Sequence, residues 1–177
     1  IEVCVWLIVI VIIGVIVASD LLYDHIRKEH PKLKLTASII KASTENGKGN
    51  VDYYRKQAER FDSVMVHTDD GFNYDLLDQL DRNKMEILVN ENCIRHCRMR
   101  EDHYTLLADQ QRRNVPHSKQ EGCRLPINEL DGQGVSCNFS TEEMKRVYDM
   151  GFRRFKLQGR GDKTWYYLYD LSKYLLE

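Results

Sequence analysis

The sequence predicts an α/β protein, specifically an incomplete TIM-type (β/α) barrel with parallel strands. From residue 14 onward, short runs rich in Val, Ile and Leu alternate with amphipathic stretches, which is typical of repeated βα units. The connections between these segments are short. The chain has 177 residues, whereas a complete barrel needs about 250, so we expect only the later βα units of a barrel.

The first half of this region alternates between strand and helix. The expected elements are strands at 14–19, 33–40, 63–67 and 85–90, and helices at 21–30, 51–61 and 74–82. In the first helix, Leu21, Leu22 and Ile26 are expected on the inner face, and Pro31 ends it. Each pair of neighbouring strands therefore has one crossover helix.

The second half departs from this rhythm before resuming it. Residues 91–113 are polar and helix-prone, and residues 114–138, which contain Pro116 and Pro126, are expected to form an elaborated loop with cysteines. A helix at 141–150, capped by Ser140 or Thr141, a strand at 154–157 and a helix at 164–176 then complete a single partial barrel domain, residues 14–177.

An apolar run from Val3 to Ala18 precedes the first helix. Residues 14–19 of this run are assigned to a barrel strand, whereas residues 1–13 suit either a further buried strand or a membrane anchor. A secretory signal would carry Lys or Arg before the run, and none is present. The chain begins with Ile, so we expect it to be a fragment of a longer protein.

Charge and cysteine content restrict the class of protein. Lys and Arg number 26 and Asp and Glu 27, and this balance excludes a general attraction to nucleic acid or anionic membranes. The five cysteines are an odd count with irregular spacing, unlike a secreted disulfide framework. We therefore expect a cytoplasmic protein, in which clustered thiols serve metals or redox chemistry.

Four of the cysteines are candidate metal ligands. Cys93 and Cys97 follow the strand at 85–90, and both sulfurs share one face if a helical turn begins there. Cys123 and Cys137 follow in loop-like sequence. One close pair plus two scattered cysteines favours an iron-sulfur cluster over zinc, and ordinary buried thiols are the alternative. Cys4 is expected to be a packing residue.

Polar side chains accompany the cysteines. Glu91 and His103 lie near His96 and the arginines of the same segment, where acid-base chemistry, anion binding or simple solvation would each fit. Lys156 is a charged residue on a buried-type strand, and Arg160 in the following GRG turn suits a carboxylate or phosphate. The segment TDDGFN, with Asp69 and Asp70, reads as an ordinary turn rather than a cation site.

Three segments together resemble the collagenase-like peptidase family, number 32 in the unclassified (U) series. They are GVIVASDLLYDHIRKEHPKLKLTASI, ILVNENCIRHCRMREDHY and MGFRRFKLQGR, and they span most of the chain after Gly14. The resemblance implies a TIM-barrel-like catalytic region and a four-cysteine iron-sulfur cluster. Gln158 stands where familiar branches have a glutamate, which marks a divergent member.

The resemblance also assigns site residues by position. By position it covers Glu91, His103 and Lys156, which are the expected catalytic residues. It also covers three of the expected substrate-binding residues, Asn90, Tyr104 and Arg160; the fourth, Arg100, is expected from the charged character of the same segment. Cys93 and Cys97 fall in the matching cysteine segment, whereas Cys123 and Cys137 are assigned on spacing as the remaining ligands of a four-iron, four-sulfur cluster. The implied activity is peptide hydrolysis or assistance to a hydroxylation reaction.

The alternative hypothesis is a non-catalytic module that binds RNA or an anion, with a structural zinc or thiol site. Under either hypothesis a partial barrel exposes two sheet edges. We therefore expect it to pair with a missing N-terminal barrel half or with a partner chain.

Overall fold

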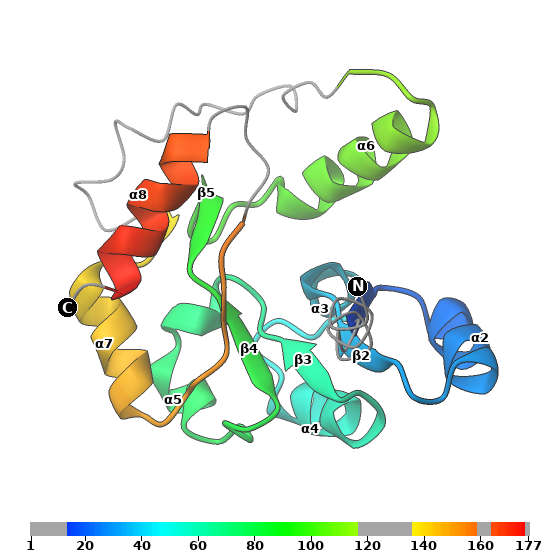
Figure 1. Cartoon of the computed structure of the whole chain (residues 1–177), viewed down its shortest axis with the longest axis horizontal. Coiled ribbons are helices and arrows are strands. Elements are labelled where there is room, and N and C mark those ends of the chain that lie inside the picture. Colours follow the sequence, from blue (N-terminus) through cyan, green and yellow to red (C-terminus); the bar gives the residue numbers. More distant parts are fainter. Residues whose placement is uncertain (1–13, 117–135, 159–163, 176–177) are drawn as a thin grey trace, which may run out of the picture.

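The computed structural model describes residues 14–116, 136–158 and 164–175 (Figure 1). Its main feature is a parallel five-stranded sheet in the order β1 (Gly14–Val17), β2 (Lys34–Ala37), β3 (Ser63–Met65), β4 (Met85–Leu88) and β7 (Phe155–Lys156). The sheet is curled into a half-barrel with flanking helices, so the predicted incomplete (β/α) barrel is confirmed. Neighbours in the sheet follow chain order, as in a barrel.

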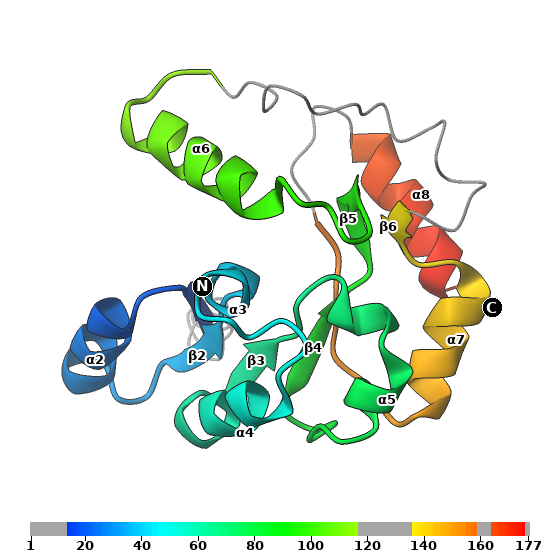
Figure 2. The same cartoon turned by 180° about the vertical axis from the view of Figure 1, so that it is seen from behind.

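Helices connect the strands and cover the sheet. They are α2 (Asp20–Glu29), α3 (Ile39–Thr44), α4 (Val51–Arg60), α5 (Tyr74–Leu77), α6 (Arg100–Arg112), α7 (Thr141–Asp149) and α8 (Thr164–Leu175). From behind, α2 lies on the β1 side of the sheet, whereas α5 and α7 lie on the β4 side (Figure 2). Of the two candidate caps, Ser140 is the one that caps α7, and it forms a capping box with Glu143.

The hydrophobic core lies between the sheet and its helices. Val64 and Ile87 contribute to it from the central strands, while Tyr54 on α4 and Phe152 after α7 are fully or almost fully buried with them. Phe139 stacks on Phe72, with ring centroids 4.2 Å apart, and closes the core near the cysteines.

Three expectations for the main sheet and its helices are wrong. Residues 39–40 belong to α3 rather than to a strand at 33–40, because the Ser38 hydroxyl accepts a hydrogen bond from the Ile40 N–H and starts a helix. The expected helix at 74–82 ends at Leu77. Leu21 and Leu22 are exposed rather than on an inner face, because α2 flanks the edge strand β1; Ile26 does pack against the core.

A second, smaller sheet carries two of the cysteines. After Val89, β4 runs into β5 (Asn90–Ile94), which pairs antiparallel with β6 (Ser136–Asn138). Val89 joins the two sheets, since its N–H donates to Lys156 and its carbonyl accepts from Phe139. The condition of a helical turn that would place Cys93 and Cys97 on one face is therefore not met, because Cys93 lies on a strand, and residues 136–138, expected in a loop, form a strand.

Among the helices of the described residues, none has both the length and the apolar character needed to cross a bilayer.

Candidate functional site

Polar side chains gather where the central strands end. β3 leads into a short loop and the 3-10 helix η1 (Asp70–Phe72), and β4 leads into β5, so both chain segments leave the sheet at its carboxyl edge. Parallel α/β proteins bind their ligands at this edge. His67, Thr68 and Asp69 after β3, and Glu91 after β4, are all buried there.

Arg100, the first residue of α6, lies at the centre of this group. Its guanidinium Nη1 is 3.0 Å from Asp69 Oδ1 as an ion pair without hydrogen-bond geometry, and its Nε is 3.9 Å from Glu91 Oε1. Nη2 donates to the Ile94 carbonyl at 2.7 Å and to Cys137 Sγ at 3.2 Å. Burial alone would lower the pKa of Arg100, but Glu91 and Asp69 raise it, so the guanidinium stays charged.

Asp69 is the most highly coordinated carboxylate of the site. Lys48 Nζ lies 2.5 Å from its Oδ2, and the His96 backbone N–H donates to Oδ1 at 2.8 Å. Burial would raise the pKa of Asp69, but Lys48, the His96 N–H and Arg100 lower it to about 2. This carboxylate is therefore ionised and internally compensated at neutral pH.

His67 is held as a neutral imidazole. The Asp69 backbone N–H donates to its Nδ1 at 3.2 Å, which leaves Nε2 as the protonated nitrogen of the neutral ring. Burial, with the nearby charge of Arg100, lowers the pKa of His67 to about 4.

Glu91 accepts hydrogen bonds on both carboxylate oxygens. Thr68 Oγ1 donates to Oε2, and the Tyr104 hydroxyl on α6 donates to Oε1 at 2.7 Å. Burial, followed by the charge of Glu91, raises the pKa of Tyr104, so this hydroxyl is a donor at any physiological pH. The residues Glu91, Arg100 and Tyr104 that the sequence predicts are thus brought into direct contact.

Two of the predicted thiols come together across the small sheet. Cys93 on β5 and Cys137 on β6 lie on paired strands, both thiols are buried, and besides this burial Cys93 raises the pKa of Cys137. Cys97 follows β5 and is partly exposed. Burial raises the pKa of Cys93 to about 11 and raises that of Cys137 as well, while Arg100 acts in the opposite direction on both. Without a further positive charge both groups are neutral thiols.

Thiolates are the usual ligands of iron-sulfur clusters, and Cys93, Cys97 and Cys137 bring three sulfurs to one end of the fold. Within the described residues, no three His, Cys, Asp or Glu side chains are grouped closely enough to hold a metal ion. The fourth predicted ligand, Cys123, lies outside the described residues.

The remaining predicted residues have different surroundings. Asn90 exchanges hydrogen bonds with the backbone of Gln158, at 3.3 and 2.5 Å, and so joins the end of β4 to the end of β7. His103 is half-buried on α6, one turn after Arg100, and Lys156 is half-buried on β7. Arg160 lies outside the described residues. Their predicted roles stay predictions.

The segment after β3 belongs to the site, although the sequence predicts only an ordinary turn there. The TDDGFN segment does turn, but Asp69 and Asp70 are buried in it rather than solvated, and His67 precedes it at the end of the strand. The available signal was position, since two adjacent carboxylates directly follow a buried strand at the carboxyl edge of a parallel sheet.

No protein-family model, curated protein or solved structure matches this chain.

Proposed function

We propose that the chain is an iron-sulfur-binding, cytoplasmic member of the collagenase-like peptidase family, acting in peptide hydrolysis or in assistance to a hydroxylation reaction. The observation that carries the proposal is the meeting of Cys93 and Cys137, far apart in the sequence, beside Arg100 at the carboxyl edge of a half-barrel. Cys93, Cys97, Cys137 and the predicted Cys123 would hold the cluster, which supplies electron transfer or a Lewis acid when bound.

The thiol environment supports a metal-binding role over a nucleophilic one. A reactive cysteine has a lowered pKa and is accessible, whereas burial raises the pKa of Cys93 to about 11. Buried thiols of this kind become thiolates when a metal supplies the compensating charge. Zinc is the alternative metal, because it also takes four thiolates.

The other residues of the site would bind and orient. Arg100 fixes Asp69 and Glu91 beside the thiols, and Tyr104 and Thr68 occupy both oxygens of Glu91. His103 has an imidazole with no hydrogen bond or ion pair to any described residue, so it is the better placed of the two predicted bases to take a proton. A peptide, or an RNA base in the hydroxylation case, is the proposed substrate.

Anaerobic purification followed by iron and sulfide analysis tests the proposal. We expect a coloured protein whose iron and sulfide are lost in Cys93→Ser and Cys137→Ser. Cys4→Ser is the matched control, because it removes the one thiol that is not a proposed ligand, and it should retain iron. A colourless, iron-free wild-type protein with four reactive thiols would refute the proposed cluster. Zinc retained by the protein would identify the alternative metal.

The half-barrel also supports a proposal about partners. β1 and β7 are the outer strands of the main sheet, and Ile16 on β1 is exposed together with Leu21 and Leu22 on α2. We propose that a missing barrel half or a partner chain covers the β1 side.

A further inference from the structure

A cavity of about 510 Å³ lies beside the site, on the other side of Asp69. Its walls come from α3, the loop between α3 and α4, the loop after β3, and the segment from β5 into α6. The volume is in the range of small-molecule pockets. Apart from Gly49, every lining residue has a polar or charged side chain, so the cavity suits a ligand with polar groups.

The lining holds more negative than positive charge. Three carboxylates, Asp69, Asp70 and Glu101, face one lysine, Lys48. Lys48 pairs with Asp69, which Arg100 also neutralises from behind, so Asp69 needs no further cation. The uncompensated charge therefore belongs to Asp70 and Glu101.

Asp70 is buried, and half of its carboxylate is unused. The Tyr54 hydroxyl and the Gly49 N–H donate to Oδ2 at 2.7 and 2.8 Å. No described residue makes a hydrogen bond or ion pair to Oδ1, although only 3% of the residue is exposed. Burial raises the pKa of Asp70, although the hydrogen bonds from Tyr54 and Gly49 and the charge of Lys48 act in the opposite direction.

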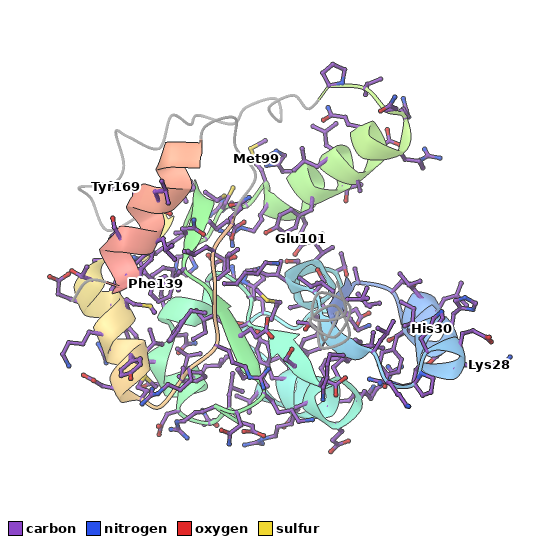
Figure 3. The ribbon with its side chains drawn as sticks, viewed as in Figure 1. Lys28, His30, Met99, Glu101, Phe139 and Tyr169 are labelled. Carbon is purple, nitrogen blue, oxygen red and sulfur yellow. The ribbon has the colours of Figure 1, made fainter. Side chains whose placement is uncertain are left out.

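Glu101 is the second uncompensated carboxylate. It lies in the first turn of α6, on the side that faces α3 (Figure 3), and it is exposed. Its side chain makes no ion pair to a described residue. The largely buried Asp70, whose Oδ1 has no partner among the described residues, and the exposed Glu101 thus border one cavity.

We propose that this cavity binds a primary ammonium group, with Asp70 and Glu101 as its counter-charges. An ammonium has three donors and one positive charge, which match the free Oδ1 of Asp70 and the surplus negative charge of the lining. A directly coordinated metal ion fits less well, since no three ligands are grouped among the described residues. A neutral polyol would leave the charge uncompensated.

The α-amino group of a peptide is a primary ammonium, so the bound group would belong to the proposed peptide substrate, and the inference rests on that proposal. The ε-amino group of a lysine side chain offers the same chemistry. Lys48 and His96, which border the same cavity, would then lie near the carbonyl groups of the bound residue.

Isothermal titration calorimetry at neutral pH tests the inference with three probes. Trialanine amide presents an α-ammonium, the amide of α-acetylated lysine presents an ε-ammonium, and N-acetylated trialanine amide presents neither. We expect one or both ammonium probes to bind, and the blocked peptide to bind about tenfold more weakly or worse, since a charge-assisted hydrogen bond is lost. The comparison of the first two probes identifies the source of the ammonium.

Asp70→Asn is the decisive variant. Its amide oxygen can still accept from Tyr54 and Gly49, while the amide nitrogen replaces Oδ1 and repels an ammonium. We expect binding to weaken about tenfold or more. Asp52→Asn, an exposed carboxylate on α4, is the matched control and should bind as the wild type does.

Three results would overturn the inference: no binding of either ammonium probe, equal binding of the blocked peptide, or unchanged affinity in Asp70→Asn. Iron analysis of the same preparations reports on the thiols alone. A failure of ammonium binding is therefore distinguishable from a failure of the proposed cluster.

Discussion

Arg100 and Lys41 are both buried cations at the carboxyl edge of the sheet, but they lie in opposite halves of it. The Arg100 side chain is 4% exposed, and its partner Asp69 is 1% exposed. The Lys41 side chain, on α3 after β2, is 0% exposed, yet its partners Asp20 and Glu45 are 51% and 38% exposed. The same kind of cation thus faces buried carboxylates at one end of the half-barrel and solvated carboxylates at the other.

From this difference we expect that the burial of the carboxylate partners, more than that of the cation, decides how much stability is lost when the cation is removed. Removing a cation from buried carboxylates leaves uncompensated charge in a medium of low dielectric constant. Removing it from solvated carboxylates leaves them to water and to other partners, and Asp20 keeps a contact of 2.9 Å with Arg60.

The largest expected effect is that of Arg100→Met. It leaves Asp69 and Glu91 buried without their shared cation, so the free energy of unfolding should fall by about 3–5 kcal/mol. Urea denaturation at pH 7 measures it. The control is Arg98→Met, an exposed arginine two positions earlier, with an expected change within about 0.5 kcal/mol. Equal losses in the two variants would contradict the central role of Arg100.

The buried half should also be the more sensitive to acid. The pKa of His67 falls from 6.5 to about 4 on folding, so between these pH values the unfolded state binds the extra proton and stability falls as the pH falls. The loss attributable to His67 is about 3 kcal/mol from pH 7 to pH 4. Urea denaturation at several pH values measures this dependence. The free energy of unfolding of His67→Gln should change less with pH between 7 and 4 than that of the wild type.

His25→Gln controls for the removal of an imidazole, because His25 is exposed on α2. Its pH profile should follow the wild type. If His67→Gln kept the full wild-type slope between pH 6.5 and pH 4, the acid sensitivity would have to be assigned elsewhere. Asp69, whose pKa is lowered to about 2, contributes only at lower pH, from about 4 downward.

Two tyrosine hydroxyls, one in each half of the sheet, allow the same comparison with smaller expected losses of stability. Tyr104→Phe removes a donor from the buried carboxylate of Glu91, and we expect a loss of about 1–2 kcal/mol in the free energy of unfolding. Tyr23→Phe in the other half removes a donor from the carbonyl of the partly exposed Arg60, which water can replace. Chemical denaturation should show the smaller loss for Tyr23→Phe, and the reverse order would break the comparison.

The smallest expected effect is that of Lys41→Met, although Lys41 is the more deeply buried cation. Met keeps most of the side-chain volume, and Asp20 and Glu45 remain solvated, so the loss should be at most about 1 kcal/mol. Thermal unfolding beside Arg100→Met, which carries the same replacement, measures the contrast. A loss as large as that of Arg100→Met would refute the argument from partner burial.

The parallel sheet was predictable because its information is local. Runs such as SVMVH and MEILVN identify β3 and β4, and short connections fix their order in the sheet. The exposure of Leu21 and Leu22 was not predictable, since it depends on whether another element lies beyond β1. The end of each strand could be located to within a few residues, as at Ser38, where a side-chain cap outcompetes the strand.

The sequence predicts several residues of the candidate site but not how they are arranged in space. The segment NENCIRHCRMREDHY contains Glu91, Cys93, Arg100 and Tyr104, and these do lie together. That Cys93 and Cys137 lie on paired strands depends on a contact between distant segments, which no local pattern encodes. The burial of Asp69 likewise depends on Arg100, a residue from another element.

The pairing of β4 with β7 also bears on how the chain folds. Val64 and Met85 pair across a short stretch of sequence, whereas Ile87 pairs with Phe155 only after β5, α6, β6 and α7 have been formed or bypassed. Closing the longer loop costs about 1 kcal/mol more in chain entropy. We therefore expect the first four strands to assemble early and β7 to dock last, with Asn90 securing it through Gln158.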